Sequence, residues 1–506
     1  MWEELLKIAM LGTDQTDLPI PLLAELQALG IDINEPPEKI LAQGLAYYRM
    51  LQKGAANIPV YEGAFPKAIE EGETTVCSPK SSRHLRLILD GTFEAALPEF
   101  ITLLNNHKRS LPPESLPALL NRCIKDKELW VKIRLAIGNT GQWLIQQNPD
   151  WQVLAPLADP KNWLMAEKEE RQNILKHWRR TAPSLAIEAL EKIWEDLTHT
   201  DKTAYLKTFQ VGLSLADEDF LEKCLDDGRK PVRQQAVELL SQLPDSLLQQ
   251  RLFEVAVEIF QYDGNHFQLI LPKELSKKIS RDGIEKQTKD YLRANRQLGW
   301  FLQIIERIPP HRWEQNFEEE PEKIITLAKA ADKTKNFIRA LARAALLHKD
   351  TAWLSAITHH WSIEQEEMEW TSSLGKKVLA GLSDQSANIL AIRYLERNEH
   401  MLDERSLASQ LLLLGGHAWE DRLTLLIVKG FQNWMTGAQN MYGNLWHYKN
   451  ILSVAAYRCS PDLRPKFQTG WYTSSRIWGL WEADVENFMR VLLFRKEMQT
   501  ALEEGK

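Results

Sequence analysis

Apolar residues recur at helical spacing along most of the chain, and the pattern is clearest between residues 225 and 240. In this segment, LDDGRKPVRQQAVELL, one side of a helix would collect Val232, Ala236, Leu239 and Leu240. Pro231 suits the first turn of that helix, where the missing N–H of proline costs nothing. The pattern predicts the turn and second helix of a HEAT-type hairpin, whose apolar stripe needs a stacked neighbour to cover it.

The same segment contains a local basic cluster, formed by Arg229, Lys230 and Arg233, beside two aspartates. Asp227 precedes Arg233 by six residues, an offset that lets an aspartate at an inter-helix turn meet an arginine on the next helix. The structural interpretation is an Asp–Arg ladder within a helical stack. The functional alternative is a contact with a phosphate or an acidic peptide.

A shift of 31 residues relates Arg171 to Lys202 and Lys202 to Arg233. The same shift aligns two sets of apolar positions, Ile174 with Tyr205 and Ala236, and Trp178 with Phe209 and Leu240. This spacing is shorter than that of consensus HEAT units. We therefore expect an all-α fold, an α-solenoid of HEAT-like helical hairpins wound as a superhelix.

The pattern divides the chain into four regions. We expect an N-terminal helical region over residues 1–150 and HEAT-like repeats over 151–261. Residues 262–322 begin with YDGNHFQLILP, which combines turn residues with a proline, so a brief strand or an irregular insertion with linking helices is expected there. C-terminal helical repeats and a cap are expected over 323–506.

The composition narrows the possible functions. The formal net charge is −7 and no third of the chain is basic, which argues against a protein that binds nucleic acid by neutralising many phosphates. The four cysteines form no CxxC pair, which is typical of buried thiols in a reducing compartment. The opening MWEELLKIAMLGT is not a signal peptide, and no stretch is apolar enough to span a membrane. We expect a cytoplasmic protein.

Two segments are candidate interaction sites. The run from Ile137 to Trp151 predicts a glycine turn followed by a short helix, with candidate residues Gly138, Gly141, Trp143, Asn148 and Trp151. Near the C-terminus, an aromatic cluster lies in a stretch that contains Gly, Ser and Thr, with candidate residues Trp471, Tyr472, Trp478 and Trp481. Each segment has a structural interpretation, as a packing element or a terminal cap, and a functional one, as a docking surface for a protein.

Sequence signatures of catalysis are missing. The chain contains no HExxH, GxSxG or GxGxxG segment, and TSSLGKK at residues 371–377 lacks the first glycine of a phosphate-binding loop. We therefore expect no catalytic residues, no cofactor and no metal site.

Several segments resemble a bacterial helical family called domain of unknown function 5691. They are LLKIAMLGTD at Leu5–Asp14, IGNTGQWLIQQNPDW at Ile137–Trp151, SRDGI at Ser280–Ile284 and IPPHRW at Ile308–Trp313. The third segment adds Arg281 and Asp282 to the candidate residues. Where the family pattern has an arginine before the second glycine, this chain has Thr140, so no role of that arginine carries over.

The resemblance implies a context for the protein. Members of this family are encoded beside MoxR-type AAA+ ATPases and von Willebrand factor A-domain proteins, which implies a role as an adaptor for such partners. We therefore expect a non-enzymatic protein-binding scaffold. The alternative is a HEAT-like nucleic-acid-binding protein or a DNA-glycosylase-like enzyme, which would hold a damaged base with Trp, Arg and Asp side chains.

Overall fold

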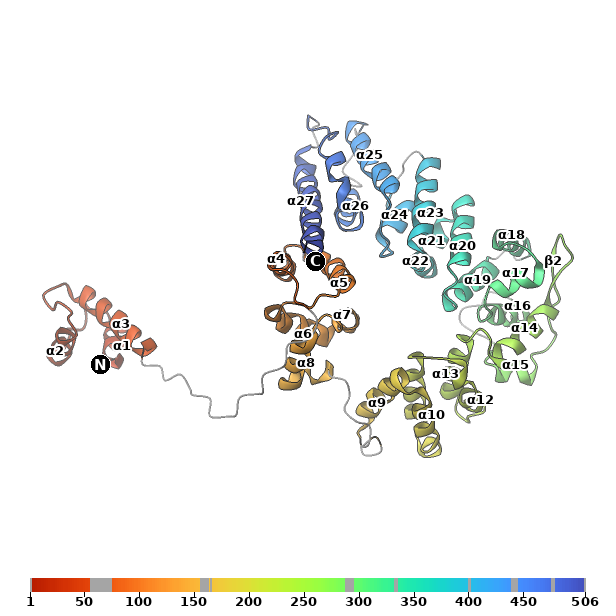
Figure 1. Cartoon of the computed structure of the whole chain (residues 1–506), viewed down its shortest axis with the longest axis horizontal. Helices are drawn as coiled ribbons and strands as arrows, with labels where there is room; N and C mark the ends of the chain where they lie inside the picture. The colour runs from red at the N-terminus through yellow and green to blue at the C-terminus, as the bar shows by residue number, and fades with distance from the viewer. Residues whose placement is uncertain are drawn as a thin grey trace. The chain divides into compact units, whose positions relative to one another are not determined.

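The computed structural model describes residues 2–54, 75–154, 163, 166–286, 295–331, 335–398, 402–437, 445–474 and 478–504. Helices form nearly all of the regular structure in these ranges, while β1 (Phe260–Tyr262) and β2 (Phe267–Leu269) pair as an antiparallel hairpin (Figure 1). The expected all-α class is confirmed. The chain folds as two compact units, Met1–Ala68 and Ile69–Lys506.

The first unit has a small apolar core. Its described helices are α1 (Trp2–Leu11), α2 (Ile20–Ala28) and α3 (Pro37–Gly54). The core collects Leu5, Ile8, Leu22, Leu26, Ile31, Ile40 and Leu41. Gly44 of α3 allows the helices to approach closely, because a Cβ atom there would lie 2.9 Å from the Cδ2 atom of Leu26.

The second unit is a succession of mostly short helices. Its N-terminal part contains α4 (Pro79–Leu89), η1 (Glu94–Ala96), α5 (Leu97–Asn106), η2 (Pro113–Ser115), α6 (Leu116–Lys125), α7 (Lys127–Ile133), α8 (Gly138–Gln147) and η3 (Pro149–Leu154). The middle part contains α9 (Lys168–Thr181), α10 (Pro183–Glu191), η5 (Trp194–Asp196), α11 (His199–Leu206), η6 (Lys207–Gln210), η7 (Leu215–Asp217), α12 (Glu218–Cys224), α13 (Lys230–Ser241), α14 (Leu247–Ile259) and α15 (Lys277–Arg281).

The C-terminal part continues in the same way. It contains α16 (Arg296–Ile305), α17 (His311–Phe317), α18 (Pro321–Ala331), α19 (Asn336–Leu347), α20 (Thr351–Ile363), α21 (Glu367–Trp370), α22 (Ser373–Ala380), α23 (Asp384–Arg397), α24 (Leu407–Leu413), α25 (Asp421–Gly437), α26 (Leu445–Arg458), η9 (Pro461–Phe467) and α27 (Trp478–Glu503).

Capping side chains set where many of these helices begin. At the starts of α4, α14, α15, α22, α23 and α24, a serine hydroxyl accepts a hydrogen bond from the backbone N–H three residues further on. Each cap satisfies a donor that has no partner inside the helix. Pro231 lies in the first turn of α13, as the sequence predicted.

One continuous apolar core runs through the second unit, from Cys77 to Leu502. It includes every apolar position aligned by the 31-residue shift, namely Ile174, Trp178, Tyr205, Phe209, Ala236 and Leu240. Helices that follow one another in the chain pack together to form it, among them α9 with α10, α12 with α13 and α23 with α24. Helical spacing therefore identified these six buried positions correctly.

The segment from residue 262, for which a strand or an irregular insertion was expected, completes the β1–β2 hairpin. Phe260 of β1 meets the rings of Phe267 and Phe317 edge-on. The hydroxyl of Tyr262 donates to Glu319 at 2.6 Å, which ties the hairpin to the short loop between α17 and α18. The brief strand is therefore present, and α15, α16 and α17 follow it.

The helix α27 packs against α4 and α5, which lie near the start of the second unit (Figure 1). Arg495 donates to both carboxylate oxygens of Glu99, at 2.6 and 3.1 Å. Phe494 stacks on Phe93, with 3.9 Å between the ring centroids. Segments 396 residues apart thus share one interface.

Candidate functional site

The Ile137–Trp151 run forms α8 and η3. A turn over residues 134–137 leads into α8, and Gly138 at the start of this helix has a φ of +60°. Gly141 lies inside the helix, where a Cβ atom would come within 2.4 Å of the Cβ atom of Ile137. The glycine turn is confirmed for Gly138. Gly141 is needed instead for close packing within the helix.

The remaining candidates of this run support η3 and its packing. Trp151 is buried and its Nε1 donates to Oδ1 of Asn121 on α6, at 2.8 Å. The side chain of Asn148 accepts from the backbone N–H of Asp150 at 3.0 Å, at the beginning of η3. Trp143 is half-buried on α8. Trp151 and Asn148 therefore act in packing, as the structural interpretation expected.

Asp227, beside the basic cluster at the start of α13, links this helix to α11. Arg233 donates to the backbone carbonyl of Asp227 at 2.6 Å, while the carboxylate of Asp227 pairs with Lys202 of α11 at 3.0 Å. The predicted Asp–Arg contact therefore forms through the backbone, and the ion pair goes to a lysine. Burial opposes ionisation of Asp227, but the N–H of Arg229 and the ammonium of Lys202 outweigh it, so the pKa of this carboxyl is lowered.

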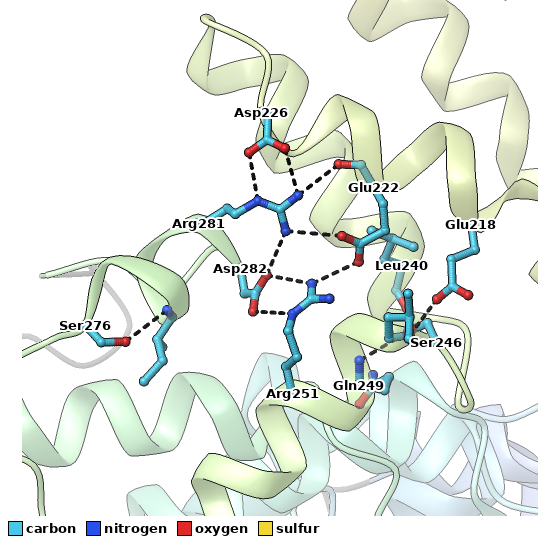
Figure 2. A network of polar contacts seen from close by, with 12 residues as sticks. Glu218, Glu222, Asp226, Leu240, Ser246, Gln249, Arg251, Ser276, Arg281 and Asp282 are labelled. Atoms are coloured by element: carbon cyan, nitrogen blue, oxygen red, sulfur yellow. Dashed lines mark hydrogen bonds and ion pairs between the residues drawn. The ribbon is translucent and has the colours of Figure 1, made fainter.

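The SRDGI segment supplies two members of an ion network between α12, α14 and α15 (Figure 2). Arg281 donates to both oxygens of Asp226, at 2.7 and 2.8 Å, and to Glu222 at 3.1 Å. Arg251 donates to both oxygens of Asp282, at 2.9 and 2.7 Å, and to Glu222 at 2.9 Å. Two guanidinium groups thus face three carboxylates.

This network locks α15 onto the rest of the unit. The side chain of Asp282 is only 3% exposed, and its bond to Arg251 is the main reason why the pKa of that guanidinium is raised. The bond to Arg281 holds the pKa of Asp226 below its usual range. Gly283 has a φ of +85°, and a Cβ atom there would lie 2.7 Å from Val237 on α13. The segment is explained by packing and ion pairing.

A second, fully buried ion pair was not predicted from the sequence. Arg179 and Asp217 are both fully buried and form two parallel bonds of 2.6 Å. Arg179 also donates to the carbonyls of Val211 and Gly212, and its guanidinium lies 4.4 Å from the ring centre of Phe209. The SLAD segment forms a capping box that ends at Asp217, which signals the start of a helix but does not identify Arg179 as the partner of this aspartate.

The four residues of the C-terminal aromatic cluster differ in how deeply they are buried. Trp481 is fully buried in the core, which fits the interpretation of the cluster as a terminal cap and excludes this residue from a docking surface. Trp471 and Trp478 are half-buried, and Tyr472 is 48% exposed. The physical reason is that α27 turns the indole of Trp481 toward Phe431 of α25, at 6.1 Å between ring centroids.

Trp471 and Trp478 line a pocket of about 550 Å³ at this end of the second unit. Its walls come from η9, the loop that follows η9, and α27. The lining residues are Arg464, Phe467, Gln468, Thr469, Gly470, Trp471, Thr473, Trp478, Val485, Glu486, Met489, Arg490 and Leu493. Its volume lies within the range of about 300–1,000 Å³ that is typical of ligand pockets. We regard this pocket as the candidate functional site.

The cysteines and the metal-binding residue types are further groups to compare with known kinds of site. The four cysteines are buried free thiols, and burial raises the pKa of Cys123, Cys224 and Cys459 to about 12. These three thiols stay protonated near neutral pH and are poor nucleophiles. Among the described residues, no group of three or more His, Cys, Asp or Glu side chains could hold a metal ion. None of the described helices is long and apolar enough to cross a membrane.

Comparison with known proteins tests the family resemblance that the LLKIAMLGTD, GNTGQW and SRDGI segments indicated. The profile of one family of unknown function, DUF5691, matches residues 4–502. No curated protein and no solved structure matches the chain. Because the match covers nearly the whole sequence, the resemblance is confirmed and the chain belongs to the family of unknown function DUF5691.

Proposed function

We propose that the second unit is an α-solenoid of HEAT-like helical hairpins, wound as a superhelix, and that it acts as a non-enzymatic scaffold for protein partners. The packing of consecutive helices around one core supports this arrangement. Ion pairs between residues 25 to 31 positions apart support it as well, namely Lys202–Asp227, Arg251–Asp282 and Arg339–Glu369.

The pocket beside Trp471 and Trp478 is the observation that carries the binding role. Tryptophan and tyrosine are enriched among the few residues that contribute most of the binding energy of protein interfaces. The arginines of the ion network, by contrast, already bond to carboxylates of their own chain. The pocket is therefore the feature that best fits an external partner.

The family resemblance supplies the kind of partner. We propose a MoxR-type AAA+ ATPase together with a von Willebrand factor A-domain protein, with this chain as their adaptor. Any ATP hydrolysis would then belong to the ATPase. The protonated thiols of the core support a role without cysteine chemistry, and free cysteines support a cytoplasmic location.

Co-expression of the full chain with the ATPase tests this function. We expect the two proteins to co-elute in size-exclusion chromatography, with a yield that depends on the bound nucleotide. Trp478→Ala should weaken the complex. Trp446→Ala is the matched control, because Trp446 is 80% exposed and does not line the pocket. Separate elution in every nucleotide state, with and without the A-domain protein, would contradict the proposal.

The nucleic-acid alternative finds less support. It requires arginines that are available to meet phosphates on a positive surface. In the network of Figure 2, Arg251 and Arg281 are instead neutralised by Glu222, Asp226 and Asp282. We therefore favour a protein partner.

A further inference from the structure

We propose that the C-terminal pocket binds an acidic peptide segment that carries one bulky apolar side chain. The apolar side chain would lie between Trp471 and Trp478, and the carboxylates would bond to Arg464 and Arg490. This inference rests on the proposed protein-binding function and names the chemistry of the segment that is bound. The pocket floor, the loop above it and the charges at its rim each support this chemistry.

The floor of the pocket is an apolar strip along α27. Val485, Met489 and Leu493 follow one another at intervals of four residues, so they lie on one face of the helix. Val485 is already buried, Met489 is half-buried and Leu493 is 39% exposed, so Met489 and Leu493 supply the apolar surface that a partner can cover. A strip of this kind gains about 25 cal/mol for each Å² of apolar surface that a partner removes from water.

The loop above the floor is held in place. The Nε1 atom of Trp471 donates to the carbonyl of Phe467 at 2.7 Å, which fixes the indole. Gly470 has a φ of +93°, and a Cβ atom there would lie 2.8 Å from Nε2 of Gln432 on α25. Gln432 also donates to the carbonyl of Thr469 at 3.2 Å. An aromatic wall fixed in advance loses little conformational entropy when a partner binds.

The charges at the rim select an acidic partner. Arg464 donates to the carbonyl of Met489 at 3.3 Å, and Arg490 donates to the side-chain amide oxygen of Asn487 at 2.8 Å. Within the described part of the chain, neither guanidinium forms an ion pair with a carboxylate. Glu486 contributes the acidic charge of the lining, so two cations face one anion. A partner carboxylate would complete the hydrogen bonding of these arginines.

Fluorescently labelled pentapeptides test the proposal with the full chain. We expect DEWED to bind measurably in fluorescence anisotropy at low salt. Replacing its tryptophan with alanine, as in DEAED, should weaken binding by about thirtyfold, because a buried aromatic anchor carries much of the affinity of an interface. The neutral peptide NQWQN should bind several times more weakly than DEWED, and the affinity of DEWED should fall as the salt concentration rises.

Variants of the chain locate the contact. Arg464→Gln and Arg490→Gln should each weaken DEWED binding by about threefold, as expected for partly exposed ion pairs, and should leave NQWQN binding unchanged. Lys466→Gln is the matched control, because Lys466 is an exposed cation on η9 that does not line the pocket. Thermal unfolding curves identify a variant that has lost its fold, in which case the salt dependence of the unmodified chain decides.

Each outcome has a distinct meaning. Equal binding of DEWED and NQWQN, or tighter binding of the basic peptide KRWRK, would overturn the inference, as would the absence of DEWED binding. In those cases a complex with the ATPase that is sensitive to Trp478→Ala would still support the proposed function. If DEWED bound as expected but the chain formed no complex with the ATPase, the proposed partner would be wrong and the proposed chemistry of the pocket would stand.

Discussion

Two pairs of arginines in the second unit differ in how completely their guanidinium groups are bonded. Arg251 and Arg281, near the middle of the chain, each bond to two carboxylates. Arg464 and Arg490, beside the C-terminal pocket, donate to one neutral oxygen each, and the guanidinium of Arg490 also lies 5.9 Å from the ring centre of Phe93. All four are cations of the same unit, so charge alone does not separate them. The two pairs differ in the groups that accept their hydrogen bonds, which are carboxylates for the first pair and neutral oxygens for the second.

This contrast suggests how structural and binding arginines can be distinguished. A guanidinium whose donors are met by buried carboxylates stabilises the fold, because removing either partner leaves an uncompensated group in a low dielectric. A guanidinium with donors still facing water contributes little to stability and can bond to an incoming anion. The contrast predicts a descending series of effects on the free energy of unfolding.

The largest effect is expected for Arg179→Met, because it leaves the fully buried carboxylate of Asp217 without its partner. The free energy of unfolding should fall by about 3–5 kcal/mol, as measured by urea denaturation. Arg180→Met is the control, since the side chain of Arg180 is exposed on the same helix. If both variants lost the same small amount of unfolding free energy, the distinction between structural and binding arginines would be wrong where it predicts the largest effect.

A smaller effect is expected for Asp282→Asn. This change keeps the shape of a side chain that is almost completely buried but removes the charge that meets Arg251, so the unfolding free energy should fall by about 1.5–3 kcal/mol. Asp245→Asn is a suitable comparison, because the side chain of Asp245 is 80% exposed. Differential scanning calorimetry of the two variants would measure the gap. If Asp282→Asn lost no more unfolding free energy than Asp245→Asn, the ion pair of Asp282 would contribute as little to stability as an exposed side chain does.

Acid should weaken the middle network through Asp226. Because the pKa of Asp226 in the folded protein lies below its ordinary value of 3.8, its contribution to stability is present above pH 3.8 and is lost as the pH falls through the folded-state pKa. Its side chain is mostly exposed, so Asp226→Asn should cost less than about 1 kcal/mol at neutral pH. The difference in melting temperature between the two proteins should therefore shrink in acid. A difference that stayed constant would exclude the ion pair as its cause.

The smallest effect on stability is expected for Arg490→Gln, at about 0.5 kcal/mol, because the change removes the contact of the guanidinium with the ring of Phe93. The donor to Asn487 is replaced by a side chain that still donates, and no carboxylate among the described residues is left unpaired. Chemical denaturation measures this value on the same sample used for peptide binding. A loss of about 2 kcal/mol or more would move Arg490 into the structural class and remove the contrast.

Much of the fold could be predicted from the sequence, because helical periodicity reports burial along one face. The aligned positions Ile174, Tyr205 and Ala236 are all core residues, and Pro231 begins the helix that it was expected to begin. Arg179 was missed for the same reason. Periodicity assigns charged residues to the solvent, and a buried cation becomes visible only when its distant carboxylate is known.

The candidate site was predicted only in part. The C-terminal cluster was recognised from its composition, but Trp478 and Trp481 could not be distinguished, although one lines the pocket and the other lies in the core. They are three residues apart on α27, which carries apolar residues around most of its circumference, so no single face stands out. Arg464 and Arg490 gave no signal, because their role depends on which side chains surround them in the folded chain.

Because α27 packs against α5, the N-terminal part of the second unit cannot finish folding until the C-terminal helix has been synthesised. Glu99 leaves the ribosome 396 residues before Arg495, and at roughly 5–20 residues per second this delay is about 20–80 s. During that time Phe93, which lies between α4 and η1, lacks the ring of Phe494 that later stacks on it. We therefore expect nascent chains of this protein to expose apolar surface that chaperones can bind.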